Sequence, residues 1–241
     1  MELVSIITPC YNSENYIKDT FQSILYQSYT NWEWIIVDDC SIDNSVELIK
    51  SFDDDRVKLF VQENNLGASE ARNKALQLAK GRYITFIDSD DLWEPMFLEK
   101  TIQFLENNNE ELVYTSYKRV DEDLYPLLED FQAIDFVDRN RILYNCPIPM
   151  LTSVYDSKRV GKISFPEVEL REDHAMWIDL LRKINHARAI KESLAIYRIR
   201  KNSVSRNKFK IALKQYDVYR KYLKMNFIKS SYYTFFGHLM E

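Results

Sequence analysis

The chain has 241 residues, a net charge of −5, 46% hydrophobic residues and 29% charged residues, a composition typical of a globular protein with one large core, or one domain and a small appendage. No apolar run is long enough to span a bilayer, and the first residues enter an expected strand directly, without the pattern of a signal peptide. Cys10, Cys40 and Cys146 are odd in number and widely spaced, which argues against a disulfide framework or a zinc site and predicts a cytoplasmic location.

Segments rich in strand-forming residues alternate with segments of helical periodicity along most of the chain. The expected strands lie at residues 3–7, 34–37, 57–61, 83–87, 112–117 and 193–199. The expected helices lie at residues 13–25, 45–52, 67–79, 95–107, 171–184 and 208–225, with Gly81 in the position after the third. Because short connections join alternating elements, the sequence predicts an α/β fold with a doubly wound, mostly parallel sheet flanked by helices.

The strand expected at 83–87 runs directly into three carboxylates, Asp88, Asp90 and Asp91. Ligands of open α/β sheets bind at this carboxyl edge. Carboxylates packed this closely repel one another, so the cluster fits a divalent cation, Mg²⁺ or Mn²⁺, shared with a phosphate. The alternative, a helix N-cap ahead of Pro95, explains one of the three acids but not all of them.

A second acidic pair, Asp38 and Asp39, follows the strand expected at 34–37. The carboxyl ends of parallel strands meet at one edge of a sheet, so we expect both acidic clusters to line one cleft. This convergence is stronger evidence for a ligand site than either cluster alone.

The periodic pattern weakens after residue 118. Residues 121–130 are acidic and contain Pro126, and we predict a solvated loop there. Residues 146–150 contain two prolines and cannot be helical. A basic, hydroxyl-rich loop is expected at residues 197–205.

Five segments of the chain form an ordered set of motifs. They are Thr8-Pro9-Cys10-Tyr11-Asn12, Val37-Asp38-Asp39-Cys40-Ser41-Ile42-Asp43, Asn65-Leu66-Gly67-Ala68-Ser69-Glu70-Ala71-Arg72-Asn73, Asp88-Ser89-Asp90-Asp91 and Arg171-Glu172-Asp173-His174-Ala175-Met176-Trp177. In order and spacing they resemble the family-two inverting glycosyltransferases, which have the GT-A fold and use nucleotide-diphosphate sugars. One DxD motif alone is weak evidence, but five ordered segments across residues 3–205 are specific.

The resemblance implies a division of the chain and an activity. It implies a GT-A domain at residues 1–205, with a nucleotide-sugar-binding half (1–118) and an acceptor-binding half (119–205), followed by a basic helical extension at 206–241. The implied activity is metal-dependent, inverting transfer of a sugar from a nucleotide-diphospho-sugar, expected to be UDP-linked. The implied acceptor is a saccharide or a lipid-linked saccharide in polysaccharide biosynthesis.

Several nucleotide contacts follow from the resemblance, residue by residue. Thr8, Pro9 and Tyr11 would shape the nucleotide pocket, with the Tyr11 ring near the base. Asp39 would accept a hydrogen bond from the uracil N–H, and Arg72 would approach the nucleotide or its phosphates.

The resemblance also assigns the acidic residues. Asp88 and Asp90 would form the DxD motif, with Asp90 the direct ligand of a Mn²⁺ or Mg²⁺ ion on the diphosphate. Asp91 would lie beside the sugar, and Asp173 matches the catalytic base. Chemistry supports this division, because charge builds on the leaving diphosphate while a carboxylate must deprotonate the attacking hydroxyl.

One position departs from the family pattern, which often reads Tyr-Arg-x-His after the last strand. Here Arg200 occupies the histidine position, and arginine can bind a diphosphate but not a metal. We therefore interpret Arg200 as a phosphate-binding residue, with an ordinary surface arginine as the alternative. His174 and His186 are expected to be structural or near the acceptor rather than metal ligands.

The C-terminal part of the chain is strongly basic. Between Arg198 and Lys229 there are eleven Lys or Arg residues against the single Asp217, so this stretch carries +10 and the rest carries −15. A basic helix with interleaved aromatic residues suits peripheral contact with an anionic membrane, on its inner face; a helix packed on the domain is the alternative. The acidic body argues against nucleic-acid binding, and a homo-oligomer is left open.

Two other functions are weighed against transfer. A sugar nucleotidyltransferase usually has a Gly-rich phosphate loop after its first strand, whereas this chain has residues 8–12 there and only four glycines in all. A non-catalytic nucleotide-sugar-binding module would not need both Asp90 and Asp173. Both alternatives stay open on sequence alone.

Overall fold

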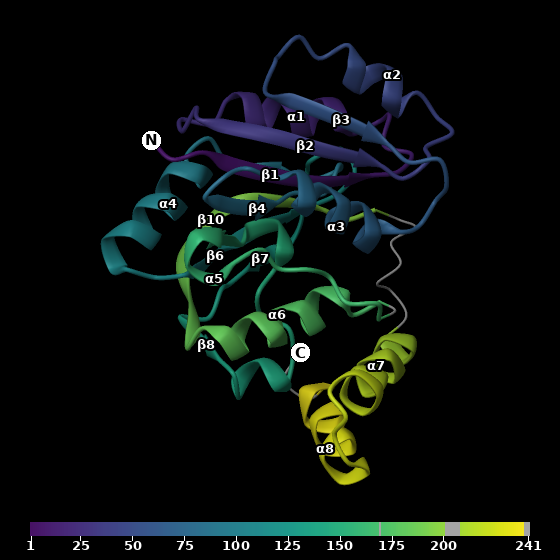
Figure 1. Cartoon of the computed structure of the whole chain (residues 1–241), viewed down its shortest axis with the longest axis vertical. Coiled ribbons are helices and arrows are strands. Elements are labelled where there is room, and N and C mark those ends of the chain that lie inside the picture. The colour runs from purple at the N-terminus through teal and green to yellow at the C-terminus, as the bar shows by residue number, and fades with distance from the viewer. Residues whose placement is uncertain (169, 201–207, 239–241) are drawn as a thin grey trace.

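The computed structural model describes residues 1–168, 170–200 and 208–238. Within them the strands form a single sheet with helices on both faces (Figure 1). The strands are β1 (Val4–Cys10), β2 (Trp32–Asp38), β3 (Val57–Val61), β4 (Tyr83–Phe86), β5 (Leu92–Trp93), β6 (Leu112–Val120), β7 (Pro126–Phe131), β8 (Phe136–Asp138), β9 (Val154–Asp156) and β10 (His186–Arg198). The helices are α1 (Ile17–Leu25), α2 (Ser45–Lys50), α3 (Ala68–Leu78), α4 (Phe97–Asn108), α5 (Ser157–Val160), α6 (Glu172–Lys183), α7 (Lys208–Asp217) and α8 (Phe227–His238), with short turns η1 (Arg141–Leu143), η2 (Met150–Thr152) and η4 (Val218–Tyr222).

The sheet confirms the predicted fold class. Its strand order is β3-β2-β1-β4-β9-β6-β10-β5, with β7 paired to β6 and β8 paired to β10. The longest pairings, β1 with β2 and β6 with β10, are parallel. β9 lies antiparallel between β4 and β6, so those two strands point the same way as the rest of the parallel set. The carboxyl ends of β1, β2 and β4 consequently meet at one edge.

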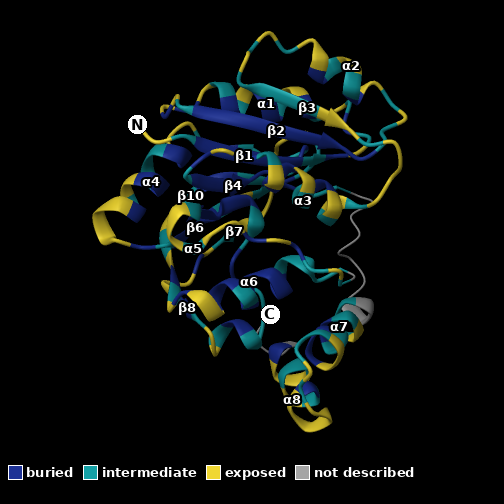
Figure 2. Cartoon of the chain, viewed as in Figure 1, coloured by how far each residue is buried: buried dark blue, intermediate teal, exposed yellow. Residues whose placement is uncertain are grey.

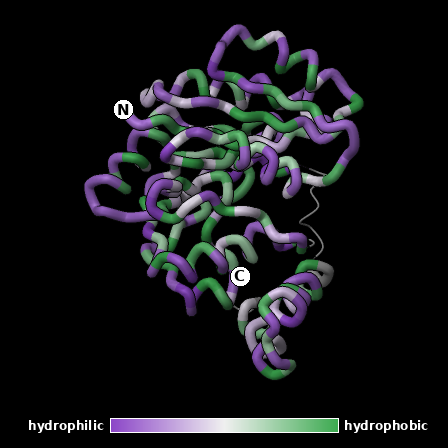
Figure 3. The backbone as a smooth tube through the Cα atoms, in the orientation of Figure 1, coloured by the Kyte–Doolittle hydropathy of each residue, from purple (hydrophilic) through white to green (hydrophobic). Residues whose placement is uncertain are grey.

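Alternation along the buried strands divides the core into two layers. On β2, Trp34 and Ile36 face the layer that includes α1, α2 and α4, whereas Ile35 and Val37 face the layer that includes α3 and α6. Figure 2 shows the central strands as the most buried part of the molecule, and Figure 3 shows hydrophobic residues running along them. This two-sided burial explains why the strands read as continuous apolar runs in the sequence.

Gly81 has a different role from the expected helix cap. α3 ends at Leu78, and its C-cap residue, Ala79, has an extended backbone instead of a left-handed one. A Cβ atom on Gly81 would lie 2.5 Å from the backbone nitrogen of Ser5, so β1 passes too close for any side chain. The prediction that Gly81 caps the helix is wrong, and close backbone approach is the reason for glycine there.

The second half of the chain contains more strand than the sequence predicted. Residues 126–131 form β7, an exposed edge hairpin strand on β6, so the solvated loop expected at 121–130 is wrong over its second half. β10 begins at His186 instead of residue 193, and β5, β8 and β9 were not expected. The prediction that residues 146–150 are not helical holds for 146–149 and is wrong at Met150, where the 3-10 turn η2 begins after Pro149.

The expected final helix at 208–225 is broken. α7 ends at Asp217, η4 forms a π-helical turn, and a separate helix, α8, follows (Figure 1). Tyr219, an aromatic residue of the expected helix, is fully buried, and its hydroxyl donates to the Leu143 carbonyl at 2.6 Å. No helix in the described ranges is long and apolar enough to cross a bilayer.

Candidate active site

A cleft of about 570 Å³ opens at the carboxyl ends of β1, β2 and β4. Its walls come from the loops after these strands, the beginning of α3 and the segment around the end of β10. It brings together the predicted site residues Pro9, Tyr11, Asp39, Arg72, Asp88, Asp90 and Arg200. The two acidic clusters therefore line one cleft, as the sequence predicted.

Thr8 lies beneath the cleft and is not part of its wall. Its side chain is fully buried, and its hydroxyl donates to the Ile87 carbonyl at 2.8 Å and accepts from the indole N–H of Trp34 at 2.8 Å. These bonds connect β1 to β2 and to the end of β4. Thr8 therefore positions the strand ends that carry Pro9 and Asp88, and does not itself line the expected nucleotide pocket.

Asp39 holds the loop that forms one side of the cleft. Its carboxylate accepts hydrogen bonds from the Gln62 amide at 2.6 Å and from the backbone N–H groups of Leu66 at 2.7 Å and Gly67 at 2.8 Å. Gly67 has φ +92°, a conformation that favours glycine. A carboxylate has about four lone-pair positions, so these three bonds leave room for one more donor.

The acidic turn, residues 88–91, is held by hydrogen bonds to its backbone. The Asp91 N–H donates to the Asp88 carbonyl at 3.2 Å, and the Thr20 hydroxyl on α1 contacts the carbonyls of Ser89 at 3.1 Å and Asp91 at 2.9 Å. The hydroxyls of Ser13 and Ser89 are 2.6 Å apart. Sequence reasoning missed Ser13 and Thr20 as parts of the site, and no residue pattern signals hydrogen bonds of this kind.

Two arginines face the side chains of the acidic turn. Arg72 Nη2 lies 2.5 Å from Asp88 Oδ1, and Arg200 Nε lies 2.8 Å from Asp90 Oδ2. Within the described chain, Arg72 Nε is buried without a hydrogen-bond partner. The cleft thus holds guanidinium groups beside carboxylates, which suits an anionic ligand bound through a cation.

Asp91 is buried below these pairs. Its carboxylate accepts the backbone N–H of Arg198 at 2.9 Å, which fixes the end of β10 against the turn. The side chain of Arg198 is buried too; its Nη2 lies 2.8 Å from Asp19 and its guanidinium lies over the Tyr16 ring. Sequence reasoning assigned no role to Arg198, which joins β10 to α1 at the floor of the cleft.

The acidic turn is electrostatically strained when it carries no cation. Burial raises the pKa of Asp90, and the neighbouring Asp88 raises it further, against the effect of Arg200. Burial, with the charges of Asp90 and Asp88, also raises the pKa of Asp91 well above its ordinary value. The site therefore favours any ligand that brings positive charge to these carboxylates.

Asp173 lies in the first turn of α6, as predicted, and outside the wall of the cleft. It is half-buried, and its Oδ1 accepts the N–H of His174 at 2.7 Å. Burial disfavours the charged guanidinium of Arg72, but Asp88, Asp173 and Glu172 together raise the pKa of Arg72. Arg72 is therefore coupled electrostatically both to the acidic turn and to the start of α6.

The two histidines discussed in the sequence make structural contacts. His174 is fully buried, with Nδ1 2.8 Å from Gln215 Oε1 and Nε2 2.5 Å from the Ile142 carbonyl, and burial lowers its pKa. His186 Nε2 lies 3.0 Å from Glu110, at the opposite end of the sheet from the cleft. Sequence reasoning missed Gln215, through which α7 contacts the residue that follows Asp173.

The oxygen donors of the cleft fit a hard divalent cation. The described residues contain no group of three His, Cys, Asp or Glu side chains that forms a complete metal site. Asp88 and Asp90 supply two carboxylates from one turn, the arrangement that Mg²⁺ accepts when substrate phosphates and water complete its coordination. Mn²⁺ takes the same kinds of ligand.

Comparison with known proteins identifies the family of the sequence. Residues 5–154 match the model of glycosyl transferase family 2. The chain is 40% identical over 232 residues to TuaG of Bacillus subtilis (strain 168), a glycosyltransferase whose name assigns it to teichuronic acid biosynthesis, covering 95% of this chain and 92% of TuaG. It is 39% identical over 218 residues to WfgD of Escherichia coli, named a UDP-Glc:alpha-D-GlcNAc-diphosphoundecaprenol beta-1,3-glucosyltransferase, covering 90% of this chain and 85% of WfgD.

Solved structures agree on the fold. S. aureus TarS 1–349 in complex with UDP-GlcNAc matches with a TM-score of 0.75 and 21% identity, over 94% of this chain and 68% of TarS 1–349. The mannosyltransferase PcManGT from Pyrobaculum calidifontis, in complex with GDP-Man and Mn²⁺, matches with a TM-score of 0.67 and 18% identity, over 92% of this chain and 64% of PcManGT. These likenesses establish the GT-A fold, and the family match with the two sequence relatives shows that the chain belongs to glycosyl transferase family 2.

Proposed function

We propose that the protein transfers a sugar from a UDP-sugar to a hydroxyl of a saccharide or lipid-linked saccharide, with a divalent metal and with inversion at the anomeric carbon. The observation that carries the proposal is the cleft in which Asp88 and Asp90 face Arg72 and Arg200. It combines carboxylates for a metal with guanidinium groups for a diphosphate.

The nucleoside part of the donor binds between Tyr11 and Asp39. Tyr11 is 47% exposed at the cleft, so its ring is available to a base, and Pro9 adds apolar surface beside it. The remaining lone pair of Asp39 accepts the imide N–H of uracil. The UDP-GlcNAc ligand of TarS and the UDP-Glc in the name of WfgD support this choice of nucleotide.

The diphosphate binds over the acidic turn. Asp90 and Asp88 hold the metal, which acts when bound as a Lewis acid on the leaving diphosphate. Arg72 and Arg200 exchange their carboxylate partners for phosphate oxygens and so stabilise the charge that develops there. The Mn²⁺ ion bound with GDP-Man in PcManGT supports the use of a divalent ion in this fold.

Asp173 acts as the general base. Its Oδ1 accepts the His174 N–H, and its Oδ2 is contacted by the Cys146 thiol at 3.9 Å. Within the described residues Oδ2 accepts only this one weak donor, so it keeps a lone pair for the proton of the acceptor hydroxyl. As the acceptor oxygen bonds to the anomeric carbon, the bond from that carbon to the phosphate oxygen breaks, and the proton passes to Asp173. A single displacement inverts the anomeric centre. Asp91, buried within the acidic turn, helps to orient the donor sugar through the positions of its neighbours.

The acceptor is a lipid-linked saccharide of polysaccharide biosynthesis. The name of WfgD specifies a diphosphoundecaprenol-linked acceptor, and the name of TuaG specifies teichuronic acid, a polysaccharide. Both relatives align over nearly the whole chain, including the segments around Asp173 that supply the acceptor side.

The test is a transfer assay with two matched variants. Labelled UDP-Glc or UDP-GlcNAc is incubated with Mn²⁺ and a synthetic GlcNAc-diphospho-lipid, and product configuration is determined by NMR. Asp173→Asn should lower kcat about 1000-fold while UDP binding stays unchanged, because only the base is lost. Asp179→Asn, the same change further along α6, should retain activity.

Other results would replace the proposal. Formation of a UDP-sugar from UTP and a sugar 1-phosphate would make the protein a nucleotidyltransferase. Tight UDP-sugar binding without transfer to any saccharide acceptor would make it a binding module. Full activity of Asp173→Asn would remove that residue from the mechanism while leaving the donor site intact.

A further inference from the structure

α8 presents its apolar side chains to solvent and its small side chains to the protein. Ile228, Tyr232, Phe235 and Phe236 follow the i, i+4, i+7, i+8 spacing of one helix face, and Ile228 is 77% exposed and Phe235 63% exposed. Ser230 and Gly237 are buried instead. This arrangement is the reverse of an ordinary surface helix, which buries its apolar face.

The inner face of α8 is fixed by close contacts that a rotated helix would lose. A Cβ atom on Gly237 would lie 1.9 Å from the Tyr144 carbonyl oxygen, so only glycine allows this approach. The Tyr233 ring lies between those of Tyr144 and Tyr219, with centroids 5.2 Å and 5.9 Å away. The helix therefore cannot turn its aromatic face inward without losing this packing. Figure 2 shows α8 at one extremity of the molecule, with exposed residues along it.

The surroundings of this face are basic. Residues 218–240 contain no Asp or Glu. Arg220, Lys221, Lys224 and Lys229 are all exposed, on α8 and on the turn before it. An apolar, aromatic face bordered by cations matches the chemistry of an anionic lipid surface, where aromatic rings lie at the headgroup level and basic side chains bind the headgroups.

We propose that the face formed by Ile228, Tyr232, Phe235 and Phe236, called here the α8 face, docks the protein on an anionic lipid bilayer. A protein partner would need both an apolar surface and acidic residues around it to match the basic residues that border this face. An anionic bilayer provides both, because its headgroups are negatively charged and its interior is apolar. The continuous helix expected at 208–225 is broken, and its aromatic residue Tyr219 is buried against the domain, so α8 and not that segment presents apolar side chains to solvent. The docking does not depend on the donor chemistry, although it would bring the cleft to a lipid-linked acceptor.

The test uses the full chain and vesicles of defined composition. Wild type should co-sediment with vesicles of phosphatidylcholine containing phosphatidylglycerol, bind pure phosphatidylcholine much more weakly, and dissociate as salt is raised. Ile228→Ser with Phe235→Ser should reduce binding at least tenfold. Tyr26→Ser with Ile42→Ser, which changes exposed apolar residues on the sheet domain, should bind as wild type.

Three results would overturn the proposal. One is wild type that stays in solution with anionic vesicles, and another is a double α8 variant that binds them as wild type does. The third is a wild-type dimer, measured by sedimentation equilibrium without vesicles, together with no binding to vesicles. If the double α8 variant were then a monomer, the α8 face would bind a second copy of the chain instead of a bilayer. UDP binding is measured on each variant as a control. A variant that binds UDP but not vesicles is folded and has lost docking alone, whereas wild type that binds vesicles but not UDP would contradict the proposed transfer activity and leave docking intact.

Discussion

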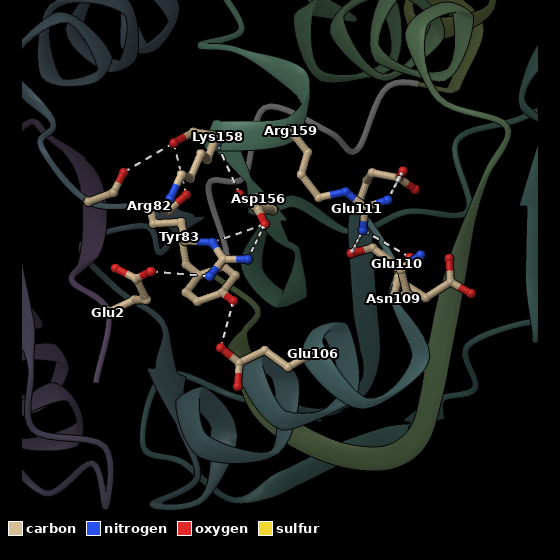
Figure 4. A network of polar contacts seen from close by, with 12 residues as sticks. Glu2, Arg82, Tyr83, Glu106, Asn109, Glu110, Glu111, Asp156, Lys158 and Arg159 are labelled. Carbon is tan, nitrogen blue, oxygen red and sulfur yellow. Dashed lines mark hydrogen bonds and ion pairs between the residues drawn. The ribbon is translucent and has the colours of Figure 1, made fainter.

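At the amino ends of its parallel strands, the sheet carries carboxylates that are matched by cations of the same chain. Arg82 contacts Asp156 at 2.8 Å and Glu2 at 3.2 Å, and Tyr83 donates to Glu106 at 2.9 Å (Figure 4). Asp156 is 2% exposed, so its charge is compensated within the protein. At the carboxyl ends of the same strands, the acidic turn gathers three aspartates, and no ion pair joins Asp91 to a cation in the described part of the chain.

The pKa values express the same contrast. Burial alone would raise the pKa of Glu33, near the amino end of β2, but hydrogen bonds from Lys58, Ser5 and the Lys80 N–H outweigh burial and lower it. At the other edge, burial and neighbouring carboxylates raise the pKa values of Asp90 and Asp91. Acids at the amino edge therefore stabilise the fold. Acids at the carboxyl edge lower the free energy of unfolding, and their placement is explained by ligand binding instead.

The largest expected effect comes from Asp90→Asn. Removing this carboxylate should abolish metal-dependent UDP binding in calorimetry and reduce kcat/KM about 1000-fold, because stabilisation of the leaving diphosphate is lost. Glu94→Gln, a nearby acid paired with Lys118 at the surface, is the control and should change neither quantity appreciably. Unchanged Mn²⁺-dependent UDP binding in Asp90→Asn would rule out the metal assignment.

The next effect tests the amino edge. Asp156→Asn should lower the free energy of unfolding by about 1.5 kcal/mol in urea denaturation, because Arg82 loses a charged hydrogen-bond partner but stays partly exposed and paired with Glu2. Asparagine can still accept the Lys158 N–H, so the cap of α5 stays and the charge alone is removed. Glu192→Gln, which breaks an exposed pair with Lys100, should cost under about 0.5 kcal/mol. Equal costs for the two changes would show that burial of the pair is irrelevant.

The same substitution at the carboxyl edge should have the opposite sign. Asp91→Asn should raise the free energy of unfolding by about 1 kcal/mol, because it removes a buried charge that neighbouring carboxylates repel. The asparagine oxygen can still accept the Arg198 N–H, so the backbone contact is kept. We expect transfer activity to fall in the same variant. A destabilised Asp91→Asn would mean that this carboxylate supports the fold as Asp156 does.

Much of the donor half of the structure could be predicted from sequence because local patterns and global fold agree there. β3 occupies the predicted residues, and the motifs that contain Asp39 and Asp90 lie at strand ends, where the topology itself brings them together. Thr20 and the Arg198 backbone could not be predicted as parts of the site, since they act through hydrogen bonds to main-chain groups that no residue pattern specifies.

The C-terminal half was harder to predict for a physical reason. β7 is an exposed edge strand whose acids, Glu129 and Asp130, give it the composition of a loop, and Pro126 is tolerated because it starts that strand. α8 reverses the usual amphipathic rule, so its apolar residues gave no signal of how it packs. In both segments, the polarity of the residues does not indicate how the segment packs against the protein.

The smallest expected effect is the pH dependence of stability. Asp90 and Asp91 have pKa values above the ordinary 3.8 when folded, so as pH falls from neutral the folded state takes up protons before the unfolded chain does and gains stability. Glu33 has the opposite sign: its pKa lies below the ordinary 4.5, so its stabilising contribution is present at neutral pH and is lost only as pH falls through the lower folded value. Between about pH 7.5 and about pH 5, the acidic turn should therefore contribute increasing stability to wild type, while Mn²⁺-dependent UDP binding weakens. Buried His174 opposes this gain, because its lowered pKa makes the folded state take up fewer protons than the unfolded chain. Comparison of wild type with Asp91→Asn by urea denaturation cancels the contribution of His174, and the difference in free energy of unfolding between the two proteins should shrink as pH falls. An identical slope in wild type and variant would show that Asp91 does not destabilise the folded state through its charge.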